Sequence, residues 1–305
     1  MRSILNKTRT GSQSGGRPPA AIELTPEGVL AAASPGKNEP AAFAFEALRP
    51  GALVPGIGEP NLREPAAVIA AIRAALGSVA PHTRAVTVVV PDTAVRVFVL
   101  DFDSLPARAA EAVPVLRFRM RKMVPFDVEH AGLSYQVLSE TETESRVLAA
   151  ILPSPILEEY ESAVRAAGYE PGAVMPSALA ALAALDSEEP VLAACLSKVA
   201  ITTSITQGND LLLYRTLDLP DEPEQRLIEV QRAVAVAAAY YEDKISVLPK
   251  TLHFAGNGDA AEFEQWFGTS ELTIVNLVQR PETGSTTAMN HMSIAGITGA
   301  LAGAA

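Results

Sequence analysis

The stretch from Val86 to Leu152 decides the fold of this chain. It begins with two apolar runs, Ala85-Val-Thr-Val-Val-Val-Pro91 and Ala94-Val-Arg-Val-Phe-Val-Leu100, and continues into the basic segment Arg117-Phe-Arg-Met-Arg-Lys-Met-Val-Pro-Phe126. The first run is rich in β-branched residues, as in a buried parallel strand. Two further strand candidates follow the basic segment. This order of elements predicts a small α+β module inserted into a larger α/β domain.

Within the inserted module the patterns predict a strand, a helix, a hairpin and a second helix. Ser104 is the expected N-cap of the first helix, whose pattern runs to about Met123. Alternating apolar residues in Leu133–Val137 predict a half-buried strand that pairs with Val147–Leu152. Ser154 is the expected cap of the second helix, which ends before a glycine, as helices commonly do.

The segments on either side of the module form two similar series. The first comprises predicted strands at 21–24, 29–32, 41–48 and 87–90, a helix at 65–76 and, after the module, a strand at 168–176 and a helix at 177–185. The second comprises predicted strands at 191–196, 200–206, 211–217, 251–255 and 272–275, and helices at 225–244 and 259–267. Periodicity alone predicts an α/β chain with two domains. The repeated order β-β-β-α-β is also the signature of the actin-like duplicated fold.

Composition narrows the class of protein. With 305 residues and 48% hydrophobic content, the chain can form two packed domains. Its net charge of −11 disfavours nucleic acid as a partner, because most of the surface would repel a polyanion. The single cysteine, Cys195, excludes an internal disulfide and fits a reducing compartment. The apolar stretch Ser293–Ala305 is shorter than the roughly 20 residues that a membrane span needs, so we expect a cytoplasmic protein without a transmembrane helix.

Several segments resemble the type IV pilus assembly protein PilM family, whose members are actin-like relatives of the cell-division protein FtsA. The similar segments are Pro50–Pro65, Val88–Val97, Arg119–Asp127 followed by Leu133–Val137, Leu211–Leu217 and Gln231–Tyr241. The Val-Pro-Phe of the third segment and the Tyr-Tyr of the last, in this order, carry the resemblance. It extends from about residue 20 to residue 305.

The resemblance implies a fold and a domain organisation. The expected fold is α/β, of the actin-like (RNase H-like) duplicated type, with an inserted α+β module of the SHS2-like kind. The first subdomain would comprise residues 21–93, 169–189 and 284–305, the inserted module residues 94–168, and the second subdomain residues 190–283. Residues 1–20, which are polar and basic without apolar periodicity, are expected to form a flexible tail.

The resemblance also implies a partner. Family members lie at the inner membrane as peripheral parts of a pilus assembly complex. They bind a short cytoplasmic N-terminal peptide of a membrane protein, PilN, in a groove that involves the inserted module. The candidate contacts here are Arg121, Met123, Val124 and Phe126, with a place in the core as the competing interpretation for Phe126. The basic cluster of Arg117, Arg119, Arg121 and Lys122 has competing interpretations too. It is either a solvated helix end or a contact with an acidic partner or anionic lipid.

The nucleotide site that the resemblance implies is eroded at its first element. Actin-like proteins hold ATP with two glycine-bearing hairpins and a Gly-rich turn, and the family's first hairpin contains Asp-Ile-Gly-Ser-Ser. The matching stretch here is Ile22-Glu-Leu-Thr-Pro-Glu27, in which Glu23 can replace the aspartate. Thr25 replaces a glycine, and Pro26 lacks an N–H donor. Glu27 places a negative charge near any phosphate, so the stretch opposes triphosphate binding.

The other two elements of that site are incomplete as well. Cys195–Lys198 replaces the expected Asp-x-Gly of the second hairpin, and Lys198 is on such a turn more often solvated than bound to phosphate. Gly256 and Gly258 stand where the family has Gly-Gly, so they are candidate adenosine contacts, unless they only form a turn. We therefore expect a pseudo-ATPase with no catalytic residues and no cofactor. Residual binding of ATP and Mg²⁺ stays open.

No other catalytic chemistry is indicated. The four histidines, His82, His130, His253 and His291, lack metal-ligand spacing, so no metal site is expected. Cys195 lies in an apolar run and is expected to be an inert core thiol. The favoured function is a peptide-binding scaffold of a pilus or type II secretion platform. The alternatives are an actin-like ATP-binding protein or ATPase with divergent phosphate loops, and a filament-forming cytoskeletal protein; self-association stays open.

Overall fold

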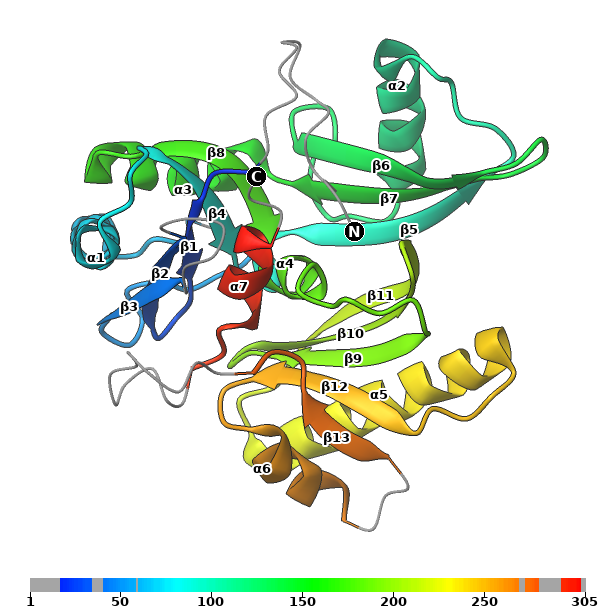
Figure 1. Cartoon of the computed structure of the whole chain (residues 1–305). Coiled ribbons are helices and arrows are strands. Elements are labelled where there is room, and N and C mark those ends of the chain that lie inside the picture. Colours follow the sequence, from blue (N-terminus) through cyan, green and yellow to red (C-terminus); the bar gives the residue numbers. More distant parts are fainter. Residues whose placement is uncertain (1–16, 35–40, 59, 269–271, 280–291, 303–305) are drawn as a thin grey trace.

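Three β-sheets organise the molecule (Figure 1). The computed structural model describes residues 17–34, 41–58, 60–268, 272–279 and 292–302. Two five-stranded sheets form the two halves of the molecule, and a three-stranded sheet extends beside the first (Figure 1). Most of the expected flexible tail lies outside the described residues. At its end, Arg17 donates to the carbonyl oxygen of Gly299 at 3.2 Å, so residues 17–20 are part of the fold.

The first sheet has the strand order β3-β2-β1-β4-β8. Its strands are β1 (Ala20–Leu24), β2 (Gly28–Ala33), β3 (Ala42–Ala47), β4 (Ala85–Val90) and β8 (Glu170–Pro176). Alternate side chains pack to opposite sides, because successive residues of a strand face opposite ways. Helices α1 (Pro65–Val79) and α3 (Ser154–Ala167) cover one face. Two short helices rich in small residues, α4 (Ser177–Leu182) and α7 (Ala295–Leu301), cover the other.

The second sheet repeats this topology in the order β11-β10-β9-β12-β13. Its strands are β9 (Val191–Leu196), β10 (Ala200–Gln207), β11 (Asp210–Asp218), β12 (Thr251–Gly256) and β13 (Thr273–Asn276). In both sheets the first three strands are antiparallel neighbours and the last two are parallel to the first. Helix α5 (Pro223–Ile245) packs on this sheet with α6 (Ala260–Glu264) and the 3₁₀ turn Gln265–Phe267. The duplication predicted from the sequence is therefore confirmed.

The inserted module follows β4 and the 3₁₀ turn Asp92–Ala94. Of the expected range 94–168, it contains β5 (Arg96–Phe102), α2 (Ala109–Met120), β6 (Gly132–Glu140) and β7 (Ser145–Leu152), and its sheet has the order β5-β7-β6. Helix α3, the second helix expected in the module, packs instead on the first sheet. Helix α2 covers the outer face of the module sheet, remote from both large sheets (Figure 1). The inner face lies against the two halves, where β11 packs along β5.

The limits of the two helices expected in the module, α2 and α3, differ from the prediction. Helix α2 starts at Ala109 rather than near Ser104, because the segment before it runs extended and buries Leu105 in the core of the module. It ends at Met120, before Met123, where the Met123 amide donates to the Met120 carbonyl oxygen in a turn. The cap residue of α3 is Pro153, and the hydroxyl of Ser154 donates instead to the carbonyl oxygen of His130.

Candidate functional site

A cleft lies where the two halves meet, and both predicted phosphate hairpins line it. Its cavity volume is ≈ 60 Å³. This volume is below the roughly 300–1,000 Å³ of sites for drug-sized ligands. The walls are residues 23–27 of the first hairpin, 195–199 of the second, 91–92, 177 and 181, 255 and 257, and 292–296 apart from Ile294.

Backbone N–H groups of the first hairpin form hydrogen bonds within the hairpin. The amide of Thr25 donates to Gly28 O at 2.9 Å, and the amide of Gly28 donates to Thr25 O at 3.2 Å. The amide of Gly28 also donates to the hydroxyl oxygen of Thr25 at 3.1 Å, while Pro26 has no amide hydrogen. A phosphate-binding turn needs free N–H groups that converge on the anion. This turn offers few of them.

The second hairpin is closed in the same way and is also held from outside. The amide of Ala200 donates to the hydroxyl oxygen of Ser197 at 3.0 Å, and the amide of Ser197 donates to Ala200 O at 2.9 Å. The Arg226 guanidinium, from the start of α5, donates to Lys198 O at 2.5 Å and to Ser197 O at 2.7 Å. Partial burial lowers the pKa of Arg226, and the charges of Asp221 and Glu27 oppose that effect. Lys198 itself lines the cleft.

Glu23 fills the floor of the cleft. Its Oε1 accepts a hydrogen bond from the hydroxyl of Ser177 at 2.5 Å, and its Oε2 accepts one from the amide of Ile297 at 3.0 Å. A Cβ atom at Gly296 would lie 2.6 Å from Oε1, so the carboxyl rests directly on the backbone of α7. Burial raises the pKa of Glu23 to about 7; the Ser177 hydrogen bond counteracts this and the charge of Asp92 adds to it.

Asp92 joins the two halves at the same place. Its Oδ1 accepts hydrogen bonds from the amide of Ala178 at 3.0 Å and from the hydroxyl of Tyr214, on β11, at 2.9 Å. Burial raises the pKa of Asp92 to about 6, although both hydrogen bonds lower it. Burial also raises the pKa of Tyr214 and of Cys195. The charges of Asp92 and Glu23 raise the pKa of the Cys195 thiol further. The expectation of an inert thiol at Cys195 agrees with this environment.

A second cavity of ≈ 250 Å³ lies beside the second hairpin. Phe254 and Phe263 stack beneath it with ring centroids 4.1 Å apart. Gly256 and Gly258 do not line it, whereas Asn257 between them lines both cavities. A Cβ at Gly256 would lie 3.1 Å from Leu196 O, and Gly258 has a φ of +90°. Close strand packing and a left-handed turn thus account for the two glycines without any adenosine contact.

The described residues offer no alternative chemistry. Among them, no group of three or more His, Cys, Asp or Glu side chains could hold a metal ion. Burial lowers the pKa of His253, which fits a structural role. His130 lies on the surface of the inserted module and His291 lies outside the described residues. The cleft therefore contains two buried carboxyl groups with hydrogen-bond donors but no paired nucleophile and base.

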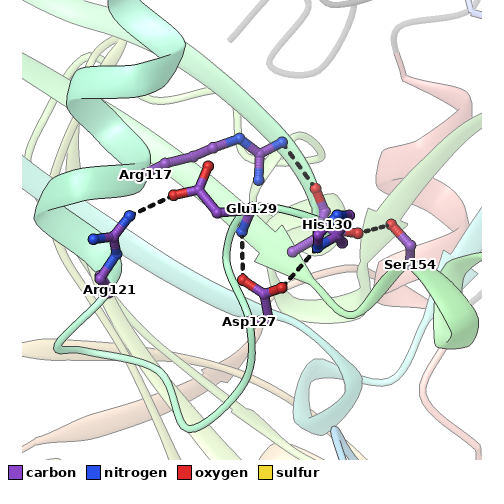
Figure 2. Close-up of polar contacts among 7 residues, drawn as sticks. Arg117, Arg121, Asp127, Glu129, His130 and Ser154 are labelled. Atoms are coloured by element: carbon purple, nitrogen blue, oxygen red, sulfur yellow. Dashed lines mark hydrogen bonds and ion pairs between the residues drawn. The ribbon is translucent and has the colours of Figure 1, made fainter.

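The loop between α2 and β6 carries the predicted partner contacts and is fixed to α2 by two arginines (Figure 2). Arg117 Nη2 donates to Ala131 O at 3.0 Å, and Arg121 Nη2 donates to Glu129 Oε1 at 2.6 Å. The side chains of Arg121 and Glu129 are 59% and 50% exposed, so water screens the pair. The two arginines therefore fix the position of the loop on α2, and the exposed Arg121–Glu129 pair adds little to the stability of the module.

A short polar chain fixes the far end of this loop (Figure 2). Asp127 Oδ1 accepts from the amide of Glu129 at 2.9 Å, and Asp127 Oδ2 lies 2.7 Å from His130 Nδ1. The His130 hydrogen bond lowers the pKa of Asp127. The hydroxyl of Ser154, at the start of α3, donates to His130 O, which ties the loop to the first half of the molecule.

The predicted contact residues separate into two classes. Arg121 and Met123 are exposed, and 42% of the Met123 surface is accessible. Val124 is buried and Phe126 is half-buried, and both pack in the core of the module. Val124 was expected to be an exposed contact, but the chain turns back at Met120 and directs this side chain inward. For Phe126 the competing core interpretation holds.

Sequence reasoning missed a polar feature on the inner face of the module sheet. The Ser134 hydroxyl and the Gln136 amide oxygen are buried, yet neither has a hydrogen-bond partner among the described residues. Both residues lie on β6 opposite Ala150 and Leu148, whose side chains face the two large sheets. Buried polar atoms without partners commonly mark a place for water or a ligand. Alternation along the strand could have predicted the face, but not the missing partners.

Comparisons with known proteins establish the fold. No protein-family model and no curated protein matches the sequence. A solved structure titled PilM–PilN type IV pilus biogenesis complex contains a similar chain, with a TM-score of 0.73, 17% identity, and coverage of 92% of this chain and 97% of that chain. The cytoplasmic domain of EpsL, an inner-membrane component of the Vibrio cholerae type II secretion system, is similar with a TM-score of 0.52, 13% identity and coverage of 92% and 94%.

A Bacteroides thetaiotaomicron protein of unknown function with an actin-like ATPase fold is also similar, with a TM-score of 0.51, 13% identity and coverage of 92% and 94%. No helix in the described ranges combines the length and the apolar character needed to cross a bilayer. The chain therefore has the actin-like fold, and the resemblance to PilM predicted from its residues is confirmed at the level of that fold.

Proposed function

We propose that this protein is an actin-like scaffold of a type IV pilus or type II secretion assembly platform. It would bind the cytoplasmic N-terminal peptide of a PilN-like membrane protein. The similarity to a chain of the PilM–PilN complex, over 92% of the present chain, carries this proposal. The protein would work in the cytoplasm and remain peripheral to the inner membrane, held there by its partner.

The state of the cleft supports a scaffold that does not hydrolyse ATP. In each hairpin the amides at the two ends of the turn are bonded within the hairpin, and the Arg226 guanidinium donates to two carbonyl oxygens of the second. Glu23 and Asp92 already accept the donors at the ends of α4 and α7. A triphosphate would have to displace these contacts and would bring negative charge next to two carboxyl groups.

The inner face of the inserted module supports binding of an extended peptide. Ser134 and Gln136 lie two residues apart on one face of β6, which matches the repeat of an extended chain. Both atoms are buried, but the two residues are partly exposed, so a side-chain rotation would bring each polar atom to the surface. A peptide backbone would then supply an N–H donor for the Gln136 oxygen and a carbonyl acceptor for the Ser134 hydroxyl. The neighbouring side chains, Ala150 and Leu148, are apolar and suit the peptide's alternate side chains.

The proposal is tested by isothermal calorimetry with a synthetic peptide of the membrane partner's N-terminus. We expect saturable binding, and at least a tenfold loss of affinity in the double variant Ser134→Ala/Gln136→Ala. Ser139→Ala, an exposed serine on the same strand, is the matched control and should bind like the unaltered protein. Absence of binding, or equal binding by all three proteins, would refute this site. Micromolar binding of Mg-ATP with turnover would refute the scaffold without ATPase activity.

A further inference from the structure

The outer face of α2 exposes apolar side chains to an unusual degree. Phe118 is 75% exposed, the largest exposed fraction among the large hydrophobic residues in the described ranges. Val115 is 37% exposed and Met123, just after the helix, is 42% exposed. Residues three apart on a helix share a face, so Val115 and Phe118 lie on one side, and Lys122 follows in the turn after the helix. An exposed apolar cluster of this kind marks an interaction surface.

The same face is basic on an otherwise acidic protein. The segment from Glu111 to Asp127 contains four basic residues and two acidic ones at its ends, and these pair with Arg108 and His130, whereas the whole chain has a net charge of −11. Arg119 and Lys122 are exposed and form no ion pair within the described part of the chain. Arg121 is paired with Glu129, so the basic side chains of Arg119 and Lys122 stay available beside Phe118. The face therefore has a charge complementary to an anionic surface.

The shape of this region favours a flat partner over a groove-bound one. Helix α2 lies at one end of the molecule, on the side of the module sheet that faces away from both large sheets (Figure 1). A side chain that is three-quarters exposed projects from the surface and does not line a groove. An aromatic residue flanked by bases on a projecting helix is the composition of helices that lie in the interface of a bilayer.

We propose that the outer face of α2 docks on a bilayer surface rich in anionic phospholipid. Phe118 and Val115 would enter the interfacial layer, and Arg119 and Lys122 would contact the lipid phosphates. Each Lys or Arg near an anionic surface raises the binding affinity roughly fivefold, so the two together raise it about 25-fold. Such binding is weak and salt-sensitive alone, and becomes effective when a second attachment holds the protein at the membrane.

Flotation of the full chain with lipid vesicles tests this docking. The protein should float with vesicles of phosphatidylglycerol and phosphatidylethanolamine at low salt. It should remain unbound to pure phosphatidylcholine vesicles, or in 0.5 M salt, where the screening length is about 4 Å. Arg119→Glu/Lys122→Glu should lose at least about 25-fold in apparent affinity, and Phe118→Ala should weaken binding as well. Arg49→Glu/Lys250→Glu changes the net charge equally at exposed sites elsewhere and should bind like the unaltered protein.

Three results would overturn the docking: no binding to anionic vesicles, equal binding to neutral ones, or the same loss in the control variant. Binding of α2 to an acidic peptide, such as poly-glutamate, without vesicle binding would assign the face to a protein partner and likewise overturn it. Calorimetry of the Arg119→Glu/Lys122→Glu variant with the PilN-like peptide separates this inference from the proposed function. Its peptide affinity should be unchanged, because Ser134 and Gln136 face the opposite side of the module sheet.

Discussion

Replacing Glu23 with Gln should stabilise the protein at alkaline pH and leave its stability nearly unchanged in acid. In the unfolded chain this carboxyl ionises near its ordinary pKa of 4.5, but in the folded protein its pKa is about 7. Between those values the folded state binds more protons than the unfolded state, so stability falls as pH rises. Once the group is ionised, the folded state has lost about 3 kcal/mol relative to its protonated form.

Glutamine has nearly the same shape and no charge, so it reproduces the protonated form of Glu23. Its oxygen can accept from the Ile297 amide, and its NH₂ group can donate to the Ser177 hydroxyl. We therefore expect Glu23→Gln to exceed the unaltered protein by roughly 2–3 kcal/mol at pH 8, and by less than about 0.5 kcal/mol at pH 4.5. Urea unfolding followed by circular dichroism at half-unit pH steps measures both values.

Glu142→Gln, at the exposed tip of the β6–β7 hairpin, provides the matched control and should not change the slope of stability against pH. Two parallel curves for Glu23→Gln and the unaltered protein would contradict the reasoning. So would a loss of stability in Glu23→Gln at pH 8. Either result would mean that the folded protein stabilises the ionised form of Glu23, for which the Ser177 hydroxyl and the Ile297 amide are the donors at hand.

Three further predictions concern the same region. Tyr214→Phe removes the donor to Asp92 and should cost about 1–3 kcal/mol in urea unfolding, because a buried acceptor loses one of its two partners; an unchanged midpoint would contradict it. Gly299→Ala places a Cβ against the Ala180 carbonyl and should lower the free energy of unfolding by about 1–3 kcal/mol. Gly77→Ala, with open space on α1, should raise it by about 0.5–1 kcal/mol, and equal effects of the two changes would exclude close α4–α7 packing. Arg226→Gln should raise amide hydrogen exchange at Ser197 and Ala200 without changing the exchange of β1, and uniform protection would show that the arginine is not needed to hold the second hairpin.

The sequence could predict the fold because its two sheets follow local rules. The β-branched run Thr87–Val90 becomes a buried central strand, and the repeated order of strands and helices predicts the duplicated topology. The limits of α2 were wrong because burial of Leu105 and the inward turn of Val124 depend on tertiary packing, which periodicity does not contain. Local propensity is overridden in this way wherever a short segment completes a core.

The polar contacts of the cleft could be predicted only in part. The eroded hairpins were evident from Thr25 and Pro26, and Glu23 was identified as a replacement for the family's aspartate. The partners of Glu23 were not predictable, because Ser177 and Ile297 lie 154 and 274 residues away in the chain. Nothing near Tyr214 in the sequence indicates Asp92, since the two are 122 residues apart and meet only where the two halves close.

The position of Asp92 connects the closed cleft with the inserted module. Asp92 precedes β5, the first strand of the module, while Tyr214 belongs to β11, which packs along β5. Arg96 on β5 lies 3.8 Å from Asp218 at the end of β11, so a second polar contact joins the same two strands. Through Asp92, which also accepts from the Ala178 amide, polar contacts connect the two halves and the module sheet directly. The scaffold that we propose would rely on these contacts to present the module sheet in a fixed orientation.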